Sequence, residues 1–173
     1  MIETNYLISV KNQFTQYKTL GEKTIDQVPD DKIYWQYNPE TNSIATIVKH
    51  LAGNMISRFT DFLTSDGEKS WRNRDVEFEN ETLSRETLVA RWNEGWNCLF
   101  DALNHLSEED LSKKVFIRKE EHTVLEAINR QLTHYASHVG QLIFIGKMVT
   151  ESQWRSLSIP RNASAAFNAK KGL

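Results

Sequence analysis

The sequence has 173 residues, of which 39% are hydrophobic and 25% charged, and its formal net charge is −2. This composition is typical of one globular domain over residues 1–173, and the scattered lysines and arginines argue against a nucleic-acid partner. No stretch approaches the roughly 18 apolar residues of a membrane span, and the N-terminus lacks a signal-peptide pattern. We therefore expect a cytoplasmic protein with no membrane partner.

Apolar residues spaced three and four apart predict four amphipathic helices. The first covers about residues 3–27. The second follows an N-cap at Asn42 or Ser43 and continues to about residue 62. The third covers about 84–105, and the fourth runs from a capping box of Thr123 and Glu126 to about residue 149.

The segments between these helices have no clear period. Residues 70–83 are expected to form a long loop, residues 106–122 a connection, and residues from about 151 an irregular tail that could include a short helix. Four helices of about 20–25 residues predict an all-α protein with a four-helix bundle. The first two connections are long enough to allow crossovers. Cys98 is the one cysteine of the sequence, so an intrachain disulfide is excluded. It lies within the third predicted helix and is expected to be an inert core thiol.

Two histidines of the fourth helix, His134 and His138, have the i, i+4 spacing at which imidazoles can share a metal ion. At about 100° per residue they lie near 240° and 280° from Ile128, on the flank of the apolar face. His50 lies near 240° from Ile44 on the second helix. Packing these flanks together would bring three imidazoles to one point, which is the pattern of a catalytic metal site with an open position.

The alternative for each histidine is a boundary residue that bonds to water or to a backbone carbonyl. His105 and His122 lie at predicted helix ends, where a charged or solvated imidazole is favourable, and neither is assigned a metal role.

The segments "SIATIVKHLAGN" and "LTHYASHVGQL", with the flanking "DFLTSDGEKSWRNRD" and "SLSIPRNASAAFN", resemble the DinB/YfiT-like metalloenzyme superfamily over nearly the whole chain. The resemblance is closest to an uncharacterised bacterial branch. It implies a four-helix bundle with crossover connectivity, often dimeric, with nickel or zinc bound at positions matching His50, His134 and His138. Relatives include S-transferases that use low-molecular-weight thiols and a maleylpyruvate isomerase, so the implied partner is a small molecule.

Three further residues are candidates for substrate binding. Asn54 lies one turn beyond His50 and could orient substrate or support that histidine; the alternative is a plain interhelical hydrogen bond. Arg72 and Arg74 flank Asn73 beside Trp71 and could hold a carboxylate or phosphate bidentately. The alternative is that they pair with local acids such as Asp75 and Glu77.

These features predict a metal-dependent transferase or hydrolase acting on a small molecule. A non-catalytic metal-binding or ligand-sensing bundle is the alternative, and a purely structural dimer would require an accidental triad. An open, polar pocket beside the metal would favour the enzyme. A C₂ homodimer is also expected, because Trp92, Trp96 and Phe100 suggest more apolar surface than one bundle buries.

Overall fold

The computed structural model describes residues 2–79 and 81–172, with side chains from residue 5 onward. Its long helices are α1 (Ile2–Ile25), α2 (Ile44–Phe59), α3 (Arg85–Asn104) and α4 (Val124–Thr150). A short α5 (Ser164–Lys170) lies in the C-terminal segment, and strands β1 (Lys114–Ile117) and β2 (Glu120–Thr123) form a small sheet. Short 3₁₀ helices cover Asp30–Lys32, Asp75–Phe78, Glu108–Ser112 and Glu151–Gln153.

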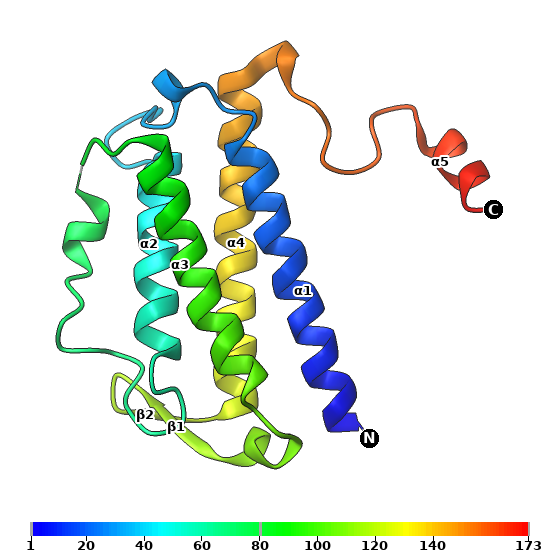
Figure 1. Ribbon diagram of the computed structural model, residues 1–173. Coiled ribbons are helices and arrows are strands. Elements are labelled where there is room, and N and C mark those ends of the chain that lie inside the picture. The colour runs from blue at the N-terminus through cyan, green and yellow to red at the C-terminus, as the bar shows by residue number, and fades with distance from the viewer. Residues whose placement is uncertain (1, 80, 173) are drawn as a thin grey trace.

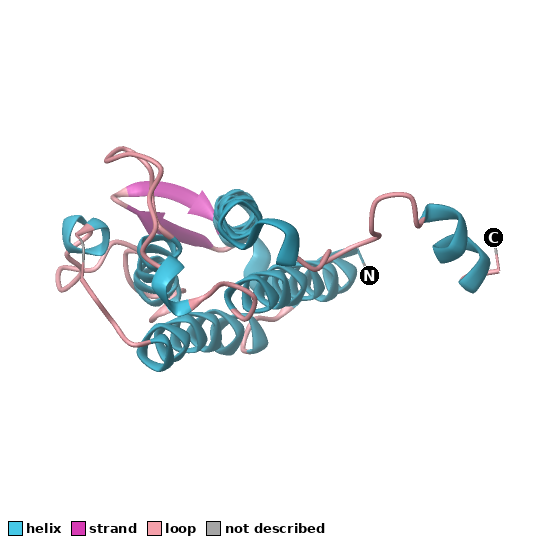
Figure 2. Cartoon of the chain, turned by 90° about the horizontal axis from the view of Figure 1, so that it is seen from above, coloured by secondary structure: helices cyan, strands magenta, loops and turns pink. Residues whose placement is uncertain are grey.

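The four long helices lie side by side, with α2 packed mainly against α3 and α1 against α4 (Figure 1). The connection from residue 60 to residue 84 returns along the outside of these helices, so α2 and α3 run in the same direction. α2 and α3 approach closely, since a Cβ added at Gly95 would lie 2.8 Å from the Cα of Ala52. Seen from above, the segment that carries α5 extends away from the other helices (Figure 2).

The helix starts follow the predicted capping residues. Ser43, rather than Asn42, is the N-cap of α2, and its Oγ accepts a hydrogen bond from the Thr46 backbone. At α4, Thr123 and Glu126 form the predicted capping box, each accepting from the other's backbone N–H. α2 ends at Phe59, three residues before the predicted end.

Aromatic side chains from three helices fill the centre of the core. Trp92 and Trp96 of α3 are fully buried, and Trp96 makes ring contacts at 5.9–6.2 Å with Phe14 of α1 and Tyr135 of α4. Half-buried Phe100 stacks on Trp96. The expectation that Trp92 and Trp96 leave surplus apolar surface was therefore wrong, because both indole rings are buried in the core between the helices.

The connection between α3 and α4 contains an antiparallel hairpin that the sequence analysis did not predict. β1 and β2 pair Lys114 with Thr123 at the open end. Arg118 and Lys119 form the turn with φ values of 56° and 67°, a backbone conformation that is unusual for residues other than glycine. The Asp66 carboxylate accepts hydrogen bonds from both of their backbone N–H groups, at 2.9 and 2.8 Å, and so stabilises the turn and ties the hairpin to the connection that follows α2.

In the part of the chain that the structure describes, no helix combines the length and apolar character that a membrane crossing needs.

Candidate metal centre

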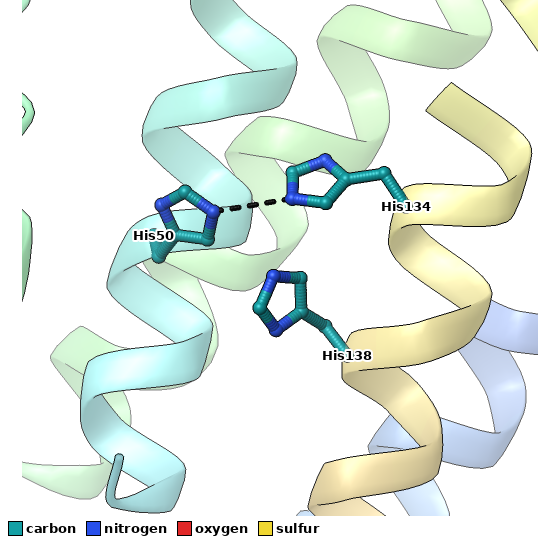
Figure 3. Close-up of side chains that lie close together, drawn as sticks. All are labelled: His50, His134 and His138. Atoms are coloured by element: carbon teal, nitrogen blue, oxygen red, sulfur yellow. Dashed lines mark hydrogen bonds between the residues drawn. The ribbon is translucent and has the colours of Figure 1, made fainter. Parts of the chain in front are cut away.

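Three histidines from two helices converge on one point, as the helical spacing predicted. His50 projects from α2, and His134 and His138 project from successive turns of α4 (Figure 3). One ring nitrogen of each lies within 4.8 Å of the others, and the ring centroids are 4.8–5.3 Å apart. Nitrogen atoms at this separation could hold a metal ion between them.

The outer nitrogen of His50 is held by an acid from the long connection. Nδ1 of His50 lies 2.9 Å from Oε2 of Glu77, and Arg72 donates two hydrogen bonds to that carboxylate, at 2.7 and 2.8 Å. Burial alone would raise the pKa of Glu77, but the hydrogen bonds from His50 and Arg72 hold it below its usual value. An ionised Glu77 makes His50 Nδ1 the donor and leaves Nε2 free to face the centre.

A glycine on α2 makes room for this acid. A Cβ added at Gly53 would lie only 2.3 Å from Oε1 of Glu77. The Glu77 carboxylate therefore packs directly against the backbone of α2 at Gly53, in space that a side chain at this position would fill. Buried Lys49 fixes the same segment, because its Nζ donates to the backbone oxygen of Glu79 at 2.6 Å.

The second histidine with an outer partner is His138, whose Nδ1 lies 2.9 Å from Oε1 of Gln141. An amide oxygen can only accept, so Nδ1 carries the hydrogen and the other ring nitrogen is unprotonated. Nε2 atoms of His50 and His134 lie 3.3 Å apart. Because His50 Nε2 is the acceptor, His134 Nε2 is the donor here, and this hydrogen would have to leave for a metal to bind.

Burial keeps the α4 imidazoles neutral at pH 7. It lowers the pKa of His134 to about 3, and repulsion from Arg130, and from His138 and His50 when they are protonated, acts in the same direction. Burial also lowers the pKa of His138. Neutral imidazole is the form that ligates metals.

The other predicted residues lie at the same site, but with partly different contacts. The Oδ1 atom of Asn54 accepts a 2.9 Å hydrogen bond from the hydroxyl of Tyr135 and not from a ring nitrogen of His50. This is the interhelical hydrogen bond given above as the alternative to a supporting role for Asn54. Arg72 pairs with Glu77, as the local-acid alternative held, while Arg74 lies over the ring of Phe78 at 4.8 Å. The sequence analysis considered Glu77 only as a partner of the arginines, whereas in the structure it also bonds to His50.

A polar cavity of about 260 Å³ opens beside His50 and His134. Asn54, Arg72 and Arg74 all line it, so the long connection folds back to the histidines and brings the predicted substrate-binding candidates beside them. Its remaining lining residues were not predicted: Arg58, Arg118, Arg130 and Gln131. They come from α2, the hairpin turn and α4, and no local sequence pattern joins them.

A larger, mainly apolar pocket of about 730 Å³ lies further along α2 and α4. Its wall includes Gln141, the partner of His138, together with the exposed side chains of Tyr37, Phe144 and Met148. Cys98 lines neither cavity. It is half-buried on α3, and burial raises its pKa, so it stays a thiol near neutral pH.

Comparison with known families adds one assignment. The family model "Protein of unknown function (DUF1572)" matches residues 1–163. The chain belongs to this family. The match covers α1 to α4 and therefore all the residues of the centre described above. A search among curated proteins gives no match.

Proposed function

We propose that this DUF1572 protein binds one divalent metal ion, nickel or zinc, through His50, His134 and His138, and that it is an enzyme acting on a small molecule. The observation that carries the proposal is the convergence of three ring nitrogens within 4.8 Å. We further propose that the four long helices have the crossover bundle of the DinB/YfiT-like superfamily, which the parallel course of α2 and α3 supports.

The residues present fit such an ion. Imidazole is an intermediate ligand that suits both nickel and zinc, so the donor set does not choose between them. Outer partners orient two of the rings, Glu77 for His50 and Gln141 for His138, as metal-ligating histidines usually require. Three protein ligands leave a further coordination position for a reactant.

The bound ion would supply Lewis-acid activation of a nucleophile near neutral pH. The chain's own residues do the rest. Glu77, held in place by Arg72, keeps His50 in the tautomer that faces the centre. The cavity beside His50 and His134 gives a small molecule access and offers polar groups that could orient it. A thiol-dependent S-transferase or a hydrolase fits these elements, with Asn54, Arg72 and Arg74 contributing to the substrate wall.

The alternative is a metal-binding or ligand-sensing bundle without turnover. A closed site would favour that reading, whereas a polar cavity that reaches two of the three histidines favours an enzyme.

The test uses tag-free protein loaded with nickel or zinc. Cysteine and glutathione are titrated into it by calorimetry, and thiol consumption is then followed with an epoxide as electrophile, beside a screen of simple esters. We expect metal-dependent turnover in one of these assays that is lost in His50→Ala. Metal binding without turnover in any of them would favour the sensing alternative.

We also propose a C₂ homodimer. Its support comes from exposed apolar residues of α4 and not from Trp92 and Trp96, which are buried. Phe144 and Met148 on α4 are 65% and 40% exposed, and Tyr37 beside them is 73% exposed. Their clustering makes this α4 face the candidate interface.

A further inference from the structure

Five arginines surround the cavity beside the histidines. Arg58 comes from α2, Arg72 and Arg74 from the long connection, Arg118 from the hairpin turn and Arg130 from α4. Arg58 and Arg72 are buried, and the other three are exposed. Because arginine has a cationic side chain, the cavity has positive groups both in its depth and at its rim.

Carboxylates neutralise only part of this charge. Glu77 pairs with Arg72, and Glu68 is shared between Arg58 at 3.1 Å and Arg118 at 2.9 Å. Within the described part of the chain, no ion pair joins Arg74 or Arg130 to a carboxylate. Like charges gathered at one cavity repel one another, and an anion bound between them would relieve that repulsion.

Two buried guanidinium N–H groups at the cavity also lack a partner. Nε of Arg58 and Nη1 of Arg72 are inaccessible to water and form no hydrogen bond with the described residues. Arg58 is 5% exposed, and the Arg72 side chain is 2% exposed. An unsatisfied buried donor of this kind costs free energy, so both guanidinium groups have hydrogen-bonding capacity that the described residues leave unused.

We infer that this cavity binds a compact oxyanionic group, a carboxylate or a phosphate, of the small molecule that the histidine centre acts upon. Only one part of this inference rests on the proposed function, namely that the histidine centre acts on the molecule that carries the anionic group. A volume of about 260 Å³ accommodates one such group together with further atoms of the same molecule. Because His50 and His134 form part of the wall, the anionic end would place the rest of the molecule at the histidines.

The test is a calorimetric titration of inorganic phosphate and of succinate into protein freed of metal by a chelator. Metal-free protein is chosen so that direct binding of the anion to the ion cannot produce the signal. The variants are Arg74→Gln and Arg130→Gln, both at exposed rim positions where folding should be unaffected. Arg161→Gln, exposed in the C-terminal segment, is the matched control for the loss of one positive charge.

We expect at least one of the two anions to bind the wild-type protein and the Arg161→Gln variant equally. Binding should weaken about tenfold to a hundredfold in Arg130→Gln or Arg74→Gln, as loss of a charge-assisted hydrogen bond predicts. Preference for phosphate would indicate a phosphorylated substrate, and preference for succinate a carboxylated one. If neither anion binds at millimolar concentration, or if both rim variants bind like the control, the inference is wrong.

The proposed function fails separately. Absence of metal from the wild-type protein would overturn the metal centre while leaving anion binding to metal-free protein intact. Metal-dependent turnover without anion binding would overturn only the inference drawn from the arginines.

Discussion

Oε2 of Glu77 lies 2.9 Å from Nδ1 of His50, although 27 residues separate them along the chain. The long connection between α2 and α3 is therefore part of the candidate metal centre as well as a link between helices. Removing its acid should change the metal site without removing a ligand.

Glu77→Gln should weaken metal affinity about tenfold to a hundredfold, because the outer partner of a metal-bound histidine orients the ring and raises its basicity. Competition with a chromophoric chelator measures this. The matched control is Glu79→Gln, an exposed acid of the same segment whose side chain does not contact His50. Equal affinity in both variants would show that Glu77 has no role in the centre.

Gly53→Ala should act through the same carboxylate. The new Cβ would lie 2.3 Å from Oε1 of Glu77, and the flexible end of that side chain would have to move away from His50. We expect a loss of metal affinity no larger than that of Glu77→Gln, and no additional loss in the double variant, since coupled sites are not additive. Additive losses in chelator competition would contradict this linkage.

Sequence reasoning went furthest where the determinants are local. The caps at Ser43 and Thr123 follow from local capping residues, and the helical period places the three histidines on the helix flanks that packing of α2 against α4 brings together. The hairpin was missed because its turn uses Arg118 and Lys119, which give no glycine or asparagine signal, and it depends on Asp66, 52 residues away. Arg72 and Arg74 were predicted for this cavity, but Arg58, Arg118 and Arg130 were missed, because they come from separate segments and the sequence pattern does not fix how those segments meet in space.

Acid should destabilise the metal-free protein. His134 has a folded pKa of about 3, below the 6.5 of an ordinary histidine, because burial opposes its protonation, as does repulsion from Arg130 and Arg58 and from His138 and His50 when they too are protonated. Between pH 6.5 and pH 3 the unfolded chain therefore binds a proton that the folded chain does not. Stability is full above pH 6.5 and falls through this window as pH decreases.

Urea midpoints of chelator-treated protein at pH 7 and pH 4.5 test this relationship. The midpoint should drop on acidification, and His134→Ala should show a smaller drop than the wild-type protein. His105→Ala is the matched control, since that side chain is 78% exposed and lies outside the centre. A drop in His134→Ala as large as that of the control would assign the acid sensitivity to other groups.

The dimer is tested by light scattering at micromolar concentration. We expect the mass of two chains for the wild-type protein and of one chain for Phe144→Asp, because a charge at an exposed apolar position opposes burial there. Ile8→Asp on α1, also exposed, is the control and should stay dimeric. A single-chain mass for the wild-type protein would contradict the proposal.

Metal analysis of tag-free protein tests the central claim most directly. Wild-type protein supplied with nickel or zinc and then desalted should retain about one ion per chain, as expected for one three-histidine site. His134→Ala should retain none while keeping the helical circular dichroism of the wild type, because apolar packing, and not the ion, holds the core together. Wild-type protein without stoichiometric metal, or equal retention by His134→Ala, would contradict the account.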